Sequence, residues 1–148
     1  MSVKKSQSRN RLGKRDYESL SAFRYALRRF LRFSEDAAEA VGITPRQHQA
    51  LLAIKGFPGR EHVTNGELAE RLQIKHHSVV GLVNRLEAQG LIVREQGDSD
   101  RREVYVTLTE RGAELLEQLT AVHREELRHI APQLGAILEG LGVNNSSR

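Results

Sequence analysis

The sequence predicts a mainly helical fold with one small β-hairpin. Apolar residues recur every three or four positions over residues 16–41 and again over 109–141, which is the period of one helix face. Between these stretches, two shorter helical patterns meet at a tight turn at 73–75. Residues 104–108 then alternate between two faces, as a strand does, with Val104 and Val106 on the face that anchors the hairpin to the core. We therefore expect long helices at both ends of the chain and a smaller mixed unit between them.

The composition is that of one domain with appended elements. The chain has 148 residues, of which 39% are hydrophobic and 28% are charged, with a formal net charge of +4. A basic excess of this size favours an acidic partner such as nucleic acid only weakly. The sequence has no cysteine, which excludes disulfides, thiolate metal sites, thiol nucleophiles and thiol redox switches.

The N-terminal segment, residues 1–15, is polar and carries six basic residues and no acid. We expect a flexible basic tail, and whether it touches phosphate groups stays open. The segment lacks the apolar stretch of a secretory signal, and no apolar run in the chain is long enough to cross a membrane. A cytoplasmic protein is the simplest interpretation.

A first long helix is expected over residues 16–42, ending near Gly42. Its stripe is longer than the core of a small domain requires. It therefore pairs either with its own domain or with a helix of a partner. The stripe consists of Leu20, Phe23, Leu27, Phe30, Ser34, Ala37 and Val41.

The middle region, residues 43–108, opens with Thr44-Pro45, which reads as an N-cap followed by proline in the first helical turn. The breaker cluster 56–59 ends this helix, and His62-Val63 follows as a short extended piece. Thr64 to Glu67 has the spacing of a capping box, which begins the next short helix.

The second helix of the pair is expected over residues 76–89. Val79, Val83 and Leu86 mark its buried face, and the small Ala69 of the preceding helix permits a close crossing. The outward face offers donors and acceptors suited to base edges and phosphates in a DNA major groove. This face consists of His76, His77, Ser78, Gly81, Asn84 and Arg85.

The hairpin has its tip at residues 97–102, after a strand that begins at 91–93. Asp100 can orient Arg102, which could then enter a narrow, A·T-rich minor groove. Arg101 and Arg94 are better placed for phosphates. A helix-turn-helix followed by such a hairpin predicts a winged helix that binds duplex DNA. A solvated hairpin with incidental ion pairs is the alternative.

A long helix is expected from Thr109 within residues 109–142, which Pro132 either interrupts or divides in two. Residues 143–148 form a frayed tail. The apolar stripe of this helix, like that of the first long helix, is longer than the core of one winged helix requires.

Two stretches resemble the MarR family of transcription regulators: ELAERLQIKHHSVVGLVNRLEAQGLIVRE and DRREVYVTLTERG. The second contains the D-x-R pair of the family's wing, Asp100 and Arg102, running into L-T-x-x-G. The resemblance covers residues 43–116, half of the chain. It implies a homodimer whose N- and C-terminal helices interlock. It also implies binding to a pseudo-palindromic operator and usually repression.

The sequence departs from the family's pattern at three positions. Gly97 replaces an aspartate of the wing, Gln73 replaces a glycine of the turn, and Gly81 stands where many members carry a polar or basic residue. This chain has no cysteine, so it cannot sense oxidants through a cysteine as some members of the family do. The resemblance also implies release by a small aromatic or phenolic effector, for which the candidates are Phe30, Phe33 and His48. Each could equally be an ordinary packing or surface residue.

Metal binding and catalysis have weaker support. His123 with Glu126, and Glu125 with His129, share helix faces, whereas the neighbouring His76 and His77 diverge by about 100°. Because no three ligands cluster, we expect no metal site and no cofactor, with a metal-responsive regulator kept as an alternative.

The sequence has no phosphate-cradling glycine loop and no G-x-S-x-G motif, so we expect no enzyme. A winged helix that only contacts proteins is another alternative. The outward Asn84 and Arg85 argue against it.

Overall fold

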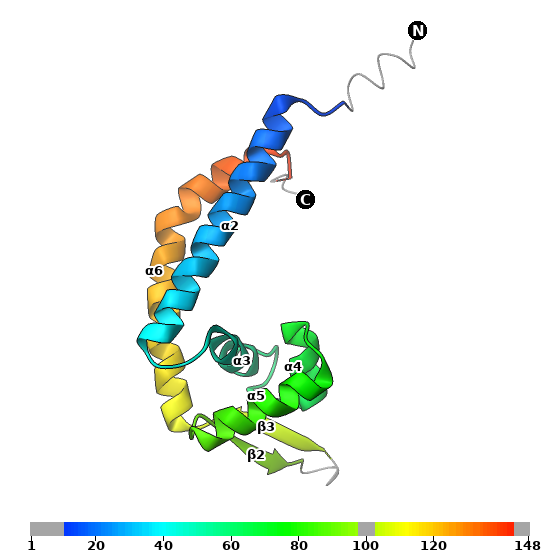
Figure 1. Ribbon diagram of the computed structural model, residues 1–148, viewed down its shortest axis with the longest axis vertical. Coiled ribbons are helices and arrows are strands. Elements are labelled where there is room, and N and C mark those ends of the chain that lie inside the picture. The colour runs from blue at the N-terminus through cyan, green and yellow to red at the C-terminus, as the bar shows by residue number, and fades with distance from the viewer. Residues whose placement is uncertain (1–10, 98–102, 144–148) are drawn as a thin grey trace. The chain divides into compact units, whose positions relative to one another are not determined.

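Figure 1 shows the computed structural model, which describes residues 11–97 and 103–143. The described residues confirm the mainly helical fold class with a small antiparallel sheet. The helices are α2 (Lys14–Ala40), α3 (Pro45–Lys55), α4 (Asn65–Leu72), α5 (His76–Ala88) and α6 (Glu110–Gly140). The strands are β1 (His62–Val63), β2 (Ile92–Gln96) and β3 (Val104–Leu108).

The chain divides into two compact units. The terminal unit consists of Met1–Phe33 and Arg124–Arg148, and the central unit is Ser34–His123. The long helices α2 and α6 each contribute to both units. The buried apolar core lies almost entirely in the central unit, from Ala38 to Leu119.

The sheet of the central unit has the order β1-β3-β2, with both pairings antiparallel. The predicted hairpin is therefore extended by a third strand, since His62 pairs with Thr107 and Val63 with Val106. Helices α3, α4 and α5 gather on one side of these strands (Figure 1). Val63, Ile92 and Val106, which are 0%, 1% and 1% exposed, are the fully buried residues of the sheet and belong to the core.

One expectation about burial in the central unit is wrong. Val104 was expected to anchor the hairpin in the core, but it is 44% exposed. At Val104 the sheet has only two strands, because β1 pairs only with Val106 and Thr107. On α3, Leu52 is 42% exposed, whereas Leu51 and Ile54 are fully buried.

Local capping explains where the shorter helices begin. Thr44 accepts a hydrogen bond from the Gln47 backbone N–H, and the Gln47 side chain accepts from the Thr44 N–H. Thr64 and Glu67 form the same reciprocal pair at the start of α4. Both predicted N-termini are thus confirmed.

The turn between α4 and α5 passes through Gln73 in the left-handed conformation, with φ 55°. This is the position where the family pattern has glycine, which adopts that conformation at no steric cost. The Gln73 side chain donates to the Glu70 carbonyl oxygen at 2.8 Å. That bond, with the helix-ending bond from the Ile74 N–H to the Ala69 carbonyl, holds the turn.

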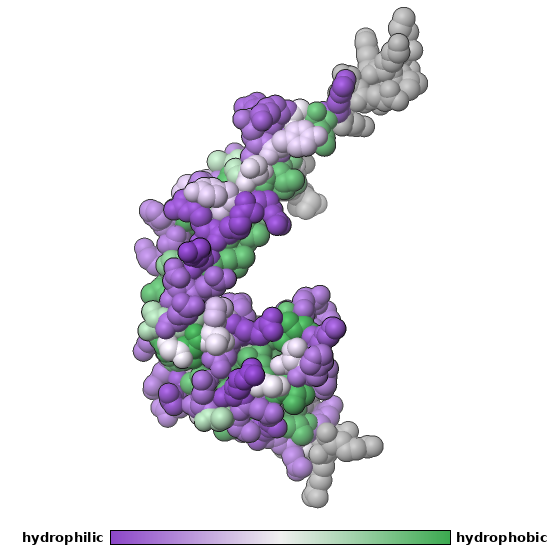
Figure 2. Space-filling view, in the orientation of Figure 1, coloured by the Kyte–Doolittle hydropathy of each residue, from purple (hydrophilic) through white to green (hydrophobic). Residues whose placement is uncertain are grey.

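The long helices are continuous in the structure. Pro132 lies inside α6 and does not begin a new helix. On α2, the stripe residues Leu20 and Leu27 are 53% and 36% exposed, so the described residues do not cover this part of the predicted stripe. Figure 2 shows hydrophobic residues, in green, exposed among hydrophilic ones along the long helices.

Candidate nucleic-acid interface

Helix α5 is held in the central unit by four apolar side chains. Val79, Val83 and Leu86 are fully buried, as predicted, and Leu82 joins them at 4% exposure. Four buried side chains on one face fix the rotation of the helix about its axis. The opposite face is thereby turned to solvent.

The outward face of α5 carries the residues predicted for it. His76, His77, Asn84 and Arg85 are exposed, and Ser78 and Gly81 are partly exposed. A Cβ atom added at Gly81 would meet no atom within 4 Å, so this glycine leaves an open gap on the face. The gap permits a close approach of another molecule to the helix backbone.

The N-terminus of α5 differs from those of α3 and α4. Its N-cap residue, Lys75, makes no side-chain hydrogen bond to the first turn. The N-terminus adjoins a shallow concave surface at the turn between the two helices, lined in part by Ala69, Gln73, Lys75 and His76. The basic Lys75 and the partial positive charge of the helix end both favour an anionic partner here.

Arg94 of β2 is tied to the outward face of α5. Its guanidinium donates a hydrogen bond to the Asn84 side-chain oxygen, and its Nε lies 3.7 Å from the Glu87 carboxylate. The sequence predicted Arg94 as a phosphate contact and Asn84 as a base contact, with no link between them. The link depends on tertiary structure, because ten residues separate the two along the chain.

The hairpin is closed at its described end by a hydrogen bond from the Gly97 N–H to the Glu103 carbonyl, at 2.9 Å. Tyr105 donates a hydrogen bond to the Glu103 carboxylate, and that bond raises the pKa of the tyrosine. Three of the residues predicted to contact DNA, Asp100, Arg101 and Arg102, lie outside the described residues.

Arg60 contacts several elements of the central unit, and no sequence pattern singled it out. Its guanidinium lies 4.5 Å from the Phe57 ring and 5.9 Å from the Tyr105 ring, and it forms an ion pair with Glu67. Burial opposes ionisation of Glu67, but hydrogen bonds from the Thr64 backbone and from Arg60 outweigh it, so the pKa of Glu67 is lowered. Arg60 thus connects the start of α4 to the wing strand β3.

A buried polar group lies in the central unit around His48, which is 2% exposed. The His48 ring lies 4.8 Å from the ring of His123, whose Nε2 is 2.8 Å from the Ser34 hydroxyl. Burial, and then the charge of His123, lower the pKa of His48. His48 had been named as an effector candidate, and here it packs against another histidine that the sequence did not connect to it.

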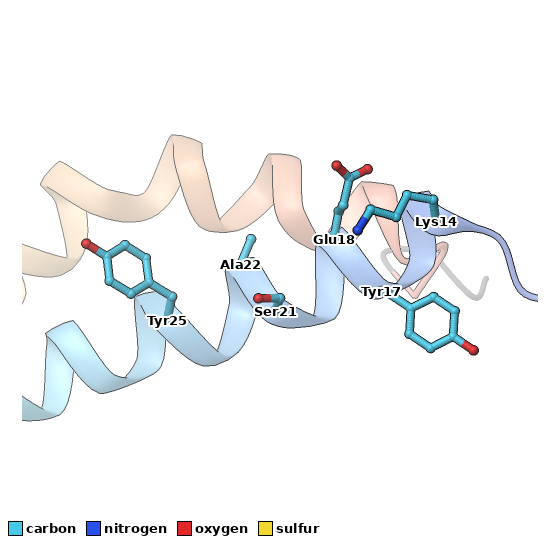
Figure 3. A pocket seen from close by; sticks show the side chains of 6 residues that line it. All are labelled: Lys14, Tyr17, Glu18, Ser21, Ala22 and Tyr25. Atoms are coloured by element: carbon cyan, nitrogen blue, oxygen red, sulfur yellow. The ribbon is translucent and has the colours of Figure 1, made fainter.

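The remaining effector candidates, Phe30 and Phe33, lie on α2 and are partly buried. Nearer the N-terminus of the same helix, an open groove follows one face of α2, and its lining side chains are drawn in Figure 3. Tyr17 and Tyr25 lie along it, 60% and 56% exposed, with the small Ser21 and Ala22 between them. This groove offers aromatic and apolar surface in the terminal unit.

Within residues 11–97 and 103–143, no three histidine or acidic side chains lie close enough together to hold a metal ion. None of the helices in that part of the chain is long and apolar enough to span a membrane.

Comparison with known proteins identifies relatives of this chain. A model of the MarR family matches residues 41–103. The organic hydroperoxide resistance transcriptional regulator of Bacillus subtilis is 30% identical over 117 residues, covering 72% of this chain and 78% of that protein. Three other curated relatives are matched over 57%, 37% and 54% of their own length.

Solved structures show the same fold. A variant of S. aureus MepR bound to an oligodeoxyribonucleotide is 27% identical, with a TM-score of 0.62 over 80% of this chain and 83% of that one. NadR in complex with 4-hydroxyphenylacetate is 25% identical, with a TM-score of 0.67 over 76% and 77%. The chain therefore belongs to the MarR family of winged-helix transcription regulators, and it is not an enzyme.

Proposed function

We propose that the chain is a sequence-specific transcription regulator that binds duplex DNA through the outward face of α5. The observation that carries the proposal is the exposed row of polar and basic side chains, held opposite four buried apolar residues. A helix presented in this way fits a major groove, where Asn and Arg side chains read base edges. The similarity to a MepR variant that is bound to an oligodeoxyribonucleotide supports DNA binding.

The finer proposal is a homodimer on a pseudo-palindromic operator. Two α5 helices would enter successive major grooves about one helical turn apart. Arg102, oriented by Asp100, would reach the flanking minor groove, with Arg101 on phosphates. The exposed apolar residues of α2 and α6 support the dimer, since they supply surface for a second copy. Acting on DNA, the protein would work in the cytoplasm.

We further propose that the protein is a repressor released by a small aromatic acid. The support is NadR in complex with 4-hydroxyphenylacetate and the repressor names of relatives such as MdtR of Bacillus subtilis. Adding 4-hydroxyphenylacetate and related phenolic acids to the protein–operator complex tests release directly.

The proposal predicts that Arg85→Ala weakens operator binding by about 5- to 150-fold, because one base or phosphate contact is lost. Operators are first selected from a random DNA pool, and affinities are then measured by fluorescence anisotropy at fixed salt. The matched control is Arg128→Ala, which removes an equal charge from an exposed site on α6.

We expect the Arg128 variant to bind as tightly as the wild type. Equal losses in the two variants would mean that only net charge matters. Failure to enrich any sequence from the pool would overturn the proposal in favour of a winged helix that contacts proteins.

A further inference from the structure

We propose that Arg111, in the first turn of α6, is a positioning residue for DNA binding, because it holds the end of α5 and so fixes the orientation in which α5 meets the bases. The inference rests on the proposed DNA-binding function and deepens it. It assigns a role to a residue at one of the unspecified positions of the L-T-x-x-G motif, away from the outward face of α5.

Helix α5 ends in a Schellman motif. Gly90 has φ 74°, and its N–H donates to the Glu87 carbonyl oxygen at 3.0 Å. The Leu91 N–H donates to the Leu86 carbonyl oxygen, also at 3.0 Å. The next carbonyl groups along the chain, those of Gln89, Gly90 and Leu91, are left to find partners outside the helix.

The start of α6 supplies a donor to each of these carbonyl groups. The Arg111 guanidinium donates to the Gln89 carbonyl oxygen at 2.9 Å. The Thr109 hydroxyl donates to Gly90 at 2.6 Å, and the Thr109 N–H donates to Leu91 at 3.0 Å. Thr109 makes both of its bonds from one residue, so Arg111 adds a separate point of attachment that opposes rotation of α5 about that residue.

The charge of Arg111 suits the end of α5 better than the start of its own helix. The first turn of a helix carries a partial positive charge, which disfavours a cation, whereas the last turn carries a partial negative charge. Within the described residues, Arg111 has no ion-pair partner. Its guanidinium therefore acts on the C-terminal end of α5.

Helix α3 holds Gln89 from a second side. The side-chain nitrogen of Gln47, a residue that is 4% exposed, donates to the Gln89 side-chain oxygen at 3.0 Å. The Gln47 amide is itself oriented, because its oxygen accepts from the Thr44 N–H. Helices α3 and α6 thus hold the same residue at the end of α5.

A small rotation at this end is amplified along the helix. Helix α5 has 13 residues. At 1.5 Å per residue it is about 20 Å long, so a rotation of about 3° at one end moves the other end by about 1 Å. A displacement of that size lengthens hydrogen bonds to base edges, whereas attraction to phosphates depends less on orientation.

The test is Arg111→Met, which removes the donor and keeps an apolar stem. Fluorescence anisotropy at fixed salt measures its affinity for the selected operator and for random-sequence duplex DNA. The control is Arg128→Met, which removes the same charge farther along α6. Relative to this control, we expect Arg111→Met to bind the operator about fivefold or more weakly, with random-sequence binding changed by less than about twofold.

Arg111→Lys keeps a cationic donor and should bind the operator within about twofold of the wild type. Equal losses on operator and random-sequence DNA in Arg111→Met would indicate a phosphate contact and overturn the inference. Because Arg111 is exposed, the Met variant should keep the wild-type free energy of unfolding in urea. A large loss of stability would show a structural role in place of a positioning one.

The outcomes separate this inference from the proposed function. If the wild type prefers its operator and Arg111→Met binds that operator equally well, the role of Arg111 fails while DNA binding stands. If the wild type prefers no sequence, the proposed function itself fails, and the inference with it.

Discussion

His48 shows how a single residue acquires properties that its sequence neighbourhood does not predict. It is buried against His123, and burial disfavours its charged form. In the unfolded chain the same ring takes up a proton near its ordinary pKa of 6.5. The folded state binds this proton only at a lower pH, because the pKa of His48 is lowered there. As the pH falls below 6.5, proton binding therefore favours the unfolded state.

We expect the free energy of unfolding to fall as the pH drops below 6.5, with a contribution from His48 of at most about 1.4 kcal/mol per pH unit. In His48→Gln this contribution should be absent, because the amide does not titrate. Urea unfolding between pH 8 and pH 5 measures it, with the exposed His129→Gln as control. The same pH dependence in His48→Gln and wild type would refute the assignment.

At the scale of elements, the start of α6 explains the glycine of the L-T-x-x-G motif. Thr109 donates through its hydroxyl to the Gly90 carbonyl oxygen at 2.6 Å, and this hydroxyl accepts from the Gly112 N–H at 3.0 Å. The Thr109 N–H donates to the Leu91 carbonyl oxygen at 3.0 Å. These bonds bring Gly112 directly against Leu91. A Cβ at Gly112 would overlap the Leu91 carbonyl oxygen.

Gly112→Ala is therefore expected to lower the free energy of unfolding by about 1 to 3 kcal/mol, since backbone must move to admit the methyl group. Gly135→Ala on the same helix is the control, because a Cβ there meets nothing within 4 Å. It should raise stability by up to about 1 kcal/mol through helix propensity. Chemical denaturation of both variants decides the matter, and equal effects would contradict the close contact.

At the scale of the whole molecule, the central unit has a core of its own, whereas the terminal unit leaves large apolar residues exposed. In the terminal unit Leu20 and Leu31 of α2 are 53% and 48% exposed, and Leu127 of α6 is 43% exposed. Apolar residues at this density along a helix face mark an interaction surface. The proposed homodimer would bury them.

Leu31→Glu is expected to convert a dimer to monomers and to weaken operator binding, because two half-sites are then no longer bound together. Light scattering at micromolar concentration measures the mass. Leu52→Glu is the matched control, since Leu52 is 42% exposed on α3 in the central unit. A monomeric wild-type protein would contradict the dimer proposal.

Local signals in the chain were enough to predict most of the helices and strands. The helix periods, the N-cap at Thr44 and the capping box at Thr64 are local signals, and the hydrogen bonds at both helix starts agree with them. The buried face of α5 was also predicted correctly, because a helix turns its apolar stripe inward wherever it packs. The exposed residues of α5 could be predicted from the position of this buried face.

The contacts between separate elements depend on how the helices pack on the sheet. Arg94 with Asn84, Arg60 with Glu67 and Tyr105, and His48 with His123 are contacts between separate elements. Side-chain chemistry at each position permits many partners, and only the packing of helices on the sheet selects one. Val104 is exposed for a similar reason. Strand β1 pairs only with Val106 and Thr107, and the alternation within β3 does not show where β1 ends.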